Sequence, residues 1–294
     1  PQTAPENTAH AHAPQPTGAK TAPLSPAQAR LWFLQTLDPT STAYNMPAAF
    51  HIEGPIDPDR LQNALSTLAK RHQALRTRIE ITADGPLQRI DPDSPIQLVR
   101  GMANRADIAR LALDERRTPF DLEVERPFRA KLLDLDDGTC LLLLTVHHIA
   151  ADGQSVALIL DQMRALYESG AEPAQESPVT GYSDIVLWED AGGGGSKRAK
   201  DLADWLDLLR DAPPRISLPF DRTPTDARSE AGARIRVALP QHLAQTLRAR
   251  AQGAETTVFT VLLAGFAAAL GEVGGNADLV IGVPVSGRIV AVSY

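Results

Sequence analysis

The chain is poor in the features that mark several common classes of protein. Its 294 residues include one cysteine, Cys140, so it can form no internal disulfide and has no zinc-ribbon pattern. No stretch approaches the roughly 18 consecutive apolar residues of a membrane-spanning helix, so we expect no membrane partner. The N-terminus lacks the basic and then apolar order of a signal peptide, and we therefore expect a reducing, cytoplasmic setting.

Positive charge is also in short supply. The chain has 29 Lys and Arg residues against 36 Asp and Glu residues, a formal net charge of −7. Nucleic-acid binding needs a concentrated basic face, so we expect no nucleic-acid partner. Apolar residues are plentiful at 43%, enough for sizeable cores. Because the chain is longer than a typical single domain, we predict two domains or two lobes.

Residues 1–22 are rich in Pro, Ala and Thr and show no apolar periodicity, which predicts a flexible linker. Helical and strand patterns then occur in both halves, so the fold class is α/β. We expect strands at 46–53, 74–81, 87–90, 128–135, 139–147, 233–239 and 278–284. A turn is expected at residues 84–85, and residues 136–138 should join 128–135 and 139–147 in a hairpin. We expect helices that begin at Pro26, with Ser25 as N-cap, at Pro58, with Asp57 as cap, and at Gly153. Further helices are expected at 108–113, 182–190, 198–210, 240–251 and 257–270.

The chemically distinctive cluster is HHIAADG, residues 147–153, at the end of an apolar strand. Adjacent strand residues point to opposite faces, so we expect one histidine to face the core and the other a cleft. Diverging rings make a two-histidine metal site improbable, and we expect no bound metal. A neutral imidazole can accept a proton at neutral pH, and Asp152 is placed to hold the loop or the ring. The alternative is that both histidines are ordinary core residues.

Further motifs carry a resemblance to a known family. HHIAADG matches the HHxxxDG signature of the condensation domains of nonribosomal peptide synthetases and their acyltransferase relatives. Five companion segments occur in the family's order across about residues 23–288. They are SPAQARLWFL at 25–34 (SxxQxRLWFL), RHQALRT at 71–77 (RHExLRT, with Gln73 in place of Glu), YSDIVLW at 182–188 (YxDYAxW), LPFDR at 218–222 (LPxDRPRP) and IGVPVSGR at 281–288 (IGxPVAGR).

The resemblance implies a two-lobed fold similar to chloramphenicol acetyltransferase, a pseudo-dimer with its active site between the lobes. We assign residues 23–175 to an N-terminal lobe and 176–294 to a partial C-terminal lobe. The family's second lobe continues well past the IGxPVAGR segment, whereas this chain stops six residues after it. We therefore expect an incomplete second lobe, and the activity of this chain by itself stays open.

The implied reaction is amide formation between an upstream carrier-bound acyl or peptidyl thioester and the amine of a downstream carrier-bound aminoacyl thioester. By resemblance, His148 is the cleft-facing group that takes the amine's proton or hydrogen-bonds the amine. His147 is structural, and Asp152 pairs with Arg288 to hold the site. The backbone N–H of Gly153 could assist an oxyanion.

The resemblance also implies partners. These are donor and acceptor peptidyl carrier proteins, which deliver 4'-phosphopantetheine arms, and a neighbouring adenylation domain; no tightly bound cofactor is expected. AYNMPAA at 43–49 resembles the subclass that joins an L-configured donor to an L-configured acceptor. Two alternatives stay open: a truncated or degenerate module that binds carrier protein without catalysis, and an acyltransferase that uses a free amine or alcohol.

Other motif residues have structural interpretations. We expect Trp32, Phe33 and Leu34 in the core. Arg71 and Arg76 are expected near the cleft, holding loops through ion pairs or backbone carbonyls. Tyr182, Asp184 and Trp188 are expected to brace the crossing between the lobes.

Overall fold

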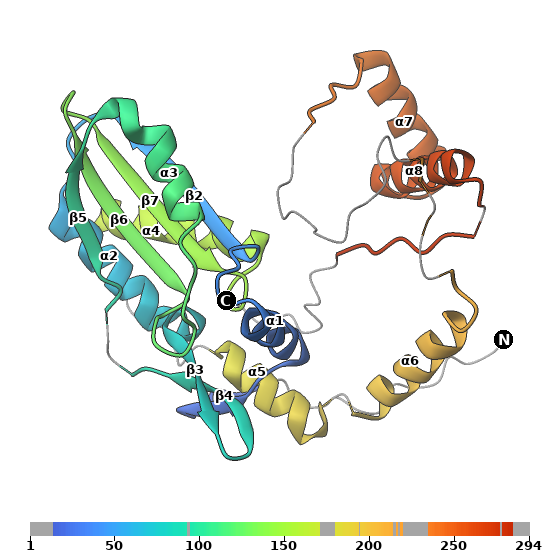
Figure 1. Ribbon diagram of the computed structural model, residues 1–294, viewed down its shortest axis with the longest axis horizontal. Helices are drawn as coiled ribbons and strands as arrows, with labels where there is room; N and C mark the ends of the chain where they lie inside the picture. The colour runs from blue at the N-terminus through green and yellow to red at the C-terminus, as the bar shows by residue number, and fades with distance from the viewer. Residues whose placement is uncertain are drawn as a thin grey trace. The chain divides into compact units, whose positions relative to one another are not determined.

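The computed structural model describes residues 14–92, 95–170, 180–193, 195–213, 216, 218–219, 235–276 and 278–284. The chain divides into two compact units, the first running to Gly195 and the second covering Ser196–Ser286. Figure 1 shows the helices and strands of both units.

A four-stranded sheet forms the centre of the first unit, in the order β2 (Asn45–Ile52), β7 (Cys140–His147), β6 (Phe128–Leu135) and β5 (Leu98–Ala103). Neighbouring strands are antiparallel except β5 and β6, which are parallel. The predicted hairpin of β6 and β7 is confirmed. All eight residues of β7 are buried, as expected for a central strand covered on both faces.

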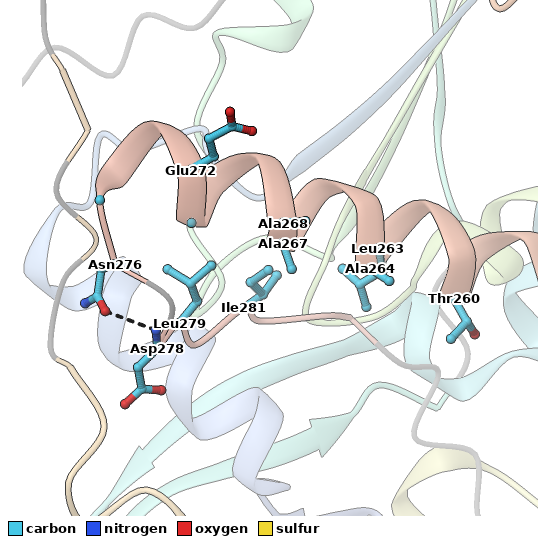
Figure 2. A pocket seen from close by; sticks show the side chains of 12 residues that line it. Thr260, Leu263, Ala264, Ala267, Ala268, Glu272, Asn276, Asp278, Leu279 and Ile281 are labelled. Carbon is cyan, nitrogen blue, oxygen red and sulfur yellow. Dashed lines mark hydrogen bonds between the residues drawn. The ribbon is translucent and has the colours of Figure 1, made fainter.

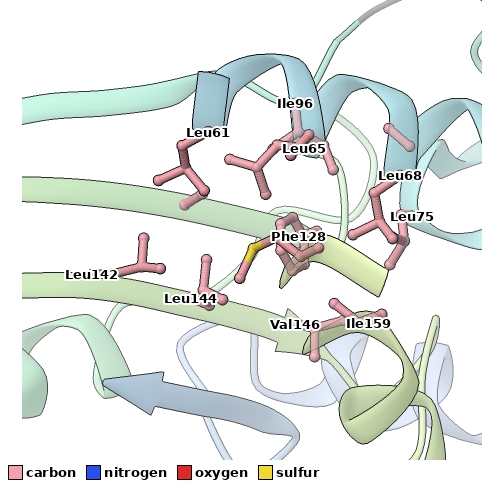
Figure 3. Close-up of a cluster of buried hydrophobic side chains, with 14 of the residues drawn as sticks. Leu61, Leu65, Leu68, Leu75, Ile96, Phe128, Leu142, Leu144, Val146 and Ile159 are labelled. Atoms are coloured by element: carbon pink, nitrogen blue, oxygen red, sulfur yellow. The ribbon is translucent and has the colours of Figure 1, made fainter. Parts of the chain in front are cut away.

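The alternation of β7 side chains places a separate core on each face of the sheet. Leu142, Leu144 and Val146 pack against α2 (Pro58–Arg71) and α4 (Gly153–Ser169). Figure 3 shows this cluster, with the leucines of α2 facing β7. Leu141 and Leu143 pack instead against α3 (Ile108–Arg116).

A small antiparallel sheet lies beside this layer, in the order β1 (Thr21–Pro23), β4 (Gly85–Ile90) and β3 (Thr77–Thr82). The strand expected from residue 74 begins later because Gln73–Arg76 forms a 3₁₀ turn, η1. The expected turn at residues 84–85 is confirmed, and Gly85 has a φ of +119°, which favours glycine.

The predicted linker 1–22 is wrong for its second part. β1 pairs with β4, and Ala22 is buried. The Thr17 N–H donates a hydrogen bond of 2.9 Å to Asp184 Oδ1, which ties residue 17 to the first unit. Composition alone could not reveal these contacts, because the partners lie far along the chain. Residues 1–13 lie outside the described residues.

Helix α1 (Pro26–Leu37) begins as predicted, with Ser25 as its N-cap in a capping box with Gln28. Its buried face carries Gln28, Leu31 and Gln35. Phe33 is 59% exposed, so its expected place in the core is wrong. The helix turns a face with two glutamines inward because these amides find hydrogen-bond partners there.

The predicted boundary between residues 175 and 176 differs from the division of the structure. Helix α5 (Tyr182–Trp188) packs on β1, and the first unit continues through it and the π-helical turn η3 (Glu189–Gly193) to Gly195. Strand β5 and the short 3₁₀ turn η2 (Arg105–Asp107) were not predicted. β5 is a six-residue strand that contains Arg100 and Gly101, which gives a weak strand signal.

The described part of the second unit contains α6 (Gly195–Leu208, which starts at the boundary), α7 (Gln241–Gly253) and α8 (Val258–Gly274), close to the predicted helices. The strands expected at 233–239 and 278–284 are wrong where described: 235–239 and 278–284 form no strand. Apolar alternation alone does not make a strand, since a strand needs a hydrogen-bonded neighbour. The incompleteness of the second lobe stays a prediction.

Within the described residues, no single helix is long and apolar enough to cross a membrane. The pair α7 and α8 passes the length and composition criteria together, with a bend of 106° between its two helices.

Candidate active site

The end of strand β7 separates the two histidines as the alternation predicts. His147 is 1% exposed, whereas His148 is exposed to solvent. The His147 N–H donates to the Pro127 carbonyl at 2.8 Å, and the His148 N–H donates to the Tyr44 carbonyl at 2.9 Å. Neighbouring chain segments on both sides therefore hold the backbone that directs the His148 side chain outward.

The His147 imidazole is held as a neutral, structural group. Its Nδ1 atom accepts the Ile149 N–H at 3.1 Å. Burial lowers the pKa of His147 to about 4, with further contributions from the charges of His148 and Arg129. A neutral ring whose Nδ1 accepts carries its proton on Nε2. The expectation that His147 is the inward-facing residue agrees with this geometry.

The turn after the histidines leads directly into α4. The Ala150 N–H donates to the His147 carbonyl at 3.0 Å. Asp152 is the N-cap of α4, and its Oδ1 accepts the Ser155 N–H at 2.8 Å and the Ser155 hydroxyl at 2.7 Å. Gly153 is the first helical residue and is exposed, and a Cβ placed there would meet no described atom within 4 Å.

A buried glutamine supports the loop from below. Gln28 Nε2 donates to Gln88 Oε1 at 3.0 Å and lies 3.5 Å from the Ile149 carbonyl oxygen. The Ser25 N–H donates to Gln28 Oε1 at 3.0 Å, and the Tyr182 hydroxyl donates to Ser25 Oγ at 2.9 Å. In the sequence, Gln28 is recognisable only as one residue of the SPAQARLWFL motif. Its spacing of three from Leu31 places both on one face of the helix, and this spacing was the only sign that Gln28 would be buried.

Arg76 of the RHQALRT segment holds loops through backbone carbonyls, as expected, while the same role for Arg71 stays a prediction. Arg76 Nε donates to the Ala69 carbonyl at 3.1 Å, and its Nη1 donates to the Asp91 carbonyl at 2.6 Å. The oxygen Oε1 of Gln73, which stands where the family motif has Glu, accepts the Ser183 hydroxyl at 2.9 Å. Buried Asp184 accepts the Gly181 N–H at 2.7 Å in addition to its Thr17 contacts. These partners of Asp184 and Gln73 all belong to the first unit.

Several expected site features fall elsewhere. Arg288 lies outside the described residues, so its expected pairing with Asp152 stays a prediction. A hollow of about 880 Å³ lies in the second unit, beside α8. Figure 2 shows its lining, which includes no predicted site residue. No group of three or more His, Cys, Asp or Glu residues in the described ranges could hold a metal ion.

Residues that sequence reasoning missed lie in the segment before β6. Phe120 is 3% exposed and meets the His147 ring edge-on, with ring centroids 5.8 Å apart. Phe120 and Leu122 pack with Leu31, Ile79 and Ile149 in a core cluster beneath the loop. No regular periodicity marks this segment, so only the fold reveals it.

The first unit thus presents one exposed imidazole on a firmly held loop, at the end of a buried central strand and beside a helix N-terminus. An exposed imidazole in such a place is able to take a proton from a bound substrate or to hydrogen-bond to it. The model of the condensation-domain family matches residues 18–291. The chain belongs to the condensation-domain family.

Two curated relatives illustrate the family. One of the plipastatin synthase proteins of Bacillus subtilis is 35% identical over 92% of this chain and 10% of its own length. Phosphinothricin tripeptide synthetase PhsC of Streptomyces viridochromogenes is 35% identical over 90% of this chain and 25% of its own length. The chain therefore spans about a tenth and a quarter of these two much longer relatives.

Solved structures agree with the expected fold. The first condensation domain of the calcium-dependent antibiotic synthetase, in complex with a substrate analogue, has a TM-score of 0.73 and 27% identity. That match covers 92% of this chain and 65% of the other. The X-domain from teicoplanin biosynthesis shares the fold with a TM-score of 0.77 at 24% identity, over 87% of this chain and 58% of the other.

Proposed function

We propose that the chain forms an amide bond in nonribosomal peptide synthesis. The substrates are an acyl or peptidyl thioester on an upstream carrier protein and an aminoacyl thioester on a downstream one. The single observation that carries the proposal is the exposed His148 at a condensation-domain HHxxxDG loop, opposite a buried His147.

In the proposed step, the amine nitrogen attacks the thioester carbonyl carbon. The new C–N bond forms, the C–S bond breaks, and the amine's proton is lost as the donor carrier's thiol is released. His148 takes this proton or hydrogen-bonds the amine. Thioester aminolysis is downhill, so the step needs no external energy source. Holding the two tethered substrates in the reactive orientation lowers the barrier.

The other site residues have supporting roles in the proposal. His147 sets the loop from inside, and Asp152 holds the start of α4 and pairs with Arg288. The Gly153 N–H assists the oxyanion of the tetrahedral intermediate. This role is compatible with its place as the first residue of α4, where backbone N–H groups point away from the helix.

The proposed partners follow from the same function. They are donor and acceptor carrier proteins with 4'-phosphopantetheine arms and an adenylation domain of the same synthetase, working in the cytoplasm. No resident cofactor takes part in the step. The sequence of residues 43–49 supports membership of the subclass that joins an L-configured donor to an L-configured acceptor.

The test is a condensation assay followed by intact-protein mass spectrometry. The chain is mixed with an acyl-loaded donor carrier and an acceptor carrier that bears an L-amino acid. We expect a dipeptidyl mass on the acceptor carrier, formed about 10²- to 10⁴-fold more slowly with His148→Ala. His242→Ala, which changes an exposed histidine of α7, is the matched control and leaves the rate unchanged.

The other results would contradict the proposal in different ways. Equal rates for His148→Ala and the unsubstituted chain would show that His148 takes no part in the reaction. Carrier binding without product in either protein would favour the carrier-binding module. Product on a free amine or alcohol without an acceptor carrier would favour the third alternative.

A further inference from the structure

Arg129 on β6 is held by several contacts at once. Its Nη2 donates to the Thr118 carbonyl at 2.7 Å, and its Nη1 donates to the Pro119 carbonyl at 2.9 Å. Its Nε donates to Glu115 Oε1 at 3.2 Å. Glu115 is buried, and its other oxygen lies 2.5 Å from Lys131 Nζ. The guanidinium fork therefore joins α3, the segment after it and β6 at one point.

Buried Glu115 is kept ionised for this role. Burial would raise its pKa, but the hydrogen bond from Lys131 and the charges of Lys131 and Arg129 outweigh that effect and hold the pKa below its usual range. The Thr145 hydroxyl, on the central strand β7, also donates to Glu115 Oε1 at 3.1 Å. The anchor of Arg129 is thus continuous with the strand that ends at His147.

The planar face of the Arg129 guanidinium contacts Phe120, which in turn contacts His147 of the candidate site. The guanidinium carbon lies 3.9 Å from the centroid of the Phe120 ring, a cation–π contact. Phe120 in turn meets the His147 ring edge-on. A second tie runs in parallel, because Asn45 Nδ2 donates to the Thr118 carbonyl at 2.8 Å and Asn45 is paired with His147 across β2 and β7.

We propose that Arg129 is a positioning residue for His148: it holds the 118–120 segment and Phe120 against His147, and so sets the loop from which His148 projects. This effect on turnover rests on the proposed amide-forming function. Neither Arg129 nor Phe120 belongs to any of the family motifs identified in the sequence.

The kinetic test compares Arg129→Gln with Arg129→Lys in the condensation assay. The glutamine keeps a donor but loses the charge and the fork, while the lysine keeps the charge alone. We expect Arg129→Gln to lower kcat by about tenfold to a hundredfold with KM for both carriers unchanged, and Arg129→Lys to lie between. Arg89→Gln, which removes an exposed arginine paired with Glu80, is the matched control and keeps full kcat.

A second readout is independent of amide formation. Nitrogen-15 NMR of histidine-labelled protein reports the tautomer of His147, assigned by the signal lost in His147→Asn. In the unchanged protein we expect an unprotonated Nδ1 and a protonated Nε2 at neutral pH. Arg129→Gln should shift the Nδ1 resonance as its hydrogen bond from Ile149 weakens, and Arg89→Gln should not. Phe120→Leu, which keeps the apolar contacts but not the ring, should give the same shift if Arg129→Gln fails to fold.

The two readouts separate this inference from the proposed function. An unchanged Nδ1 resonance in Arg129→Gln or in Phe120→Leu overturns the inference, whatever the rate. A shifted resonance with an unchanged kcat also overturns it. If the unchanged protein forms no amide while the resonance shifts, the proposed function fails and the positioning of the loop by Arg129 stands.

Discussion

At the scale of single residues, the difference between the two adjacent histidines comes from their surroundings. His147 is enclosed by Phe120, Tyr44 and the loop it supports, which disfavours its charged form. The His148 side chain, by contrast, is exposed to solvent. A strand that ends at a solvent boundary produces this contrast from two identical side chains, and the sequence alternation already indicated it.

The neutral state of His147 makes stability depend on pH. Its pKa is lowered from 6.5 to about 4, so the unfolded chain binds more protons between these values. Its contribution is fully present above pH 6.5 and is lost as pH falls toward 4, by up to about 3 kcal/mol. His147→Asn, which keeps an acceptor for the Ile149 N–H but does not titrate, should lose less stability over this range.

Urea unfolding at several pH values between 7 and 4 measures this difference. The half-buried His72 also has a lowered pKa, caused mainly by partial burial, and so adds a slope of the same sign. That slope is common to both proteins and cancels in the comparison. Parallel curves for the two proteins would mean that His147 is protonated as easily in the folded state as in the unfolded one.

At the scale of elements, helix α4 shows how a motif serves folding and the site together. The apolar positions Val156, Ile159, Leu160 and Met163 face the core of the sheet. The N-cap Asp152 and the first helical residue Gly153 belong to the HHxxxDG loop. The N-cap contact of Asp152 therefore decides where the helix starts, and the helix start decides where the loop ends.

Asp152→Ala should lower the free energy of unfolding by about 1–2 kcal/mol, because it removes the acceptor for the Ser155 N–H and hydroxyl. Asp152→Asn should retain most of that stability, since asparagine is an equally good N-cap. Thermal or urea unfolding of the three proteins checks this. If asparagine costs as much as alanine, the charge of Asp152 matters more than its cap, as the expected pairing with Arg288 would require.

At the scale of the whole molecule, the two units differ in how they bury apolar surface. In the first unit, β7 lies between two helical layers. In the second, no residue of the apolar helix α8 is buried among the described residues, and Phe259 and Phe266 are more than half exposed. Local stability follows buried contacts, so the units should differ in their resistance to opening.

Hydrogen exchange followed by mass spectrometry tests this difference. Amides of β7 should exchange only through global unfolding, for which about 5–15 kcal/mol is typical. Peptides from residues 258–274 should exchange well before them, by local opening of α8. Equal protection of the two elements would mean that the apolar face of α8 is covered in solution.

The sequence by itself determined the family, the α/β class and most of the elements. The Ser25 and Asp57 caps, the turn at Gly85 and the mostly apolar sequence of β7 depend on neighbouring residues, so local patterns predicted them. The opposite environments of His147 and His148 followed from strand alternation in the same way. The sequence-based predictions were wrong where a segment has the pattern of a strand but no neighbouring strand to pair with, as at 278–284.

Only the tertiary structure decided what holds the candidate site. Gln28 reaches the Ile149 carbonyl across 121 positions of sequence, and Arg129 of β6 meets Phe120 from a different segment. Thr17 is bound to the first unit because a buried carboxylate from α5 reaches it, although its own sequence has the composition of a linker. Such contacts depend on how whole elements pack, and no pattern within one element carries that information.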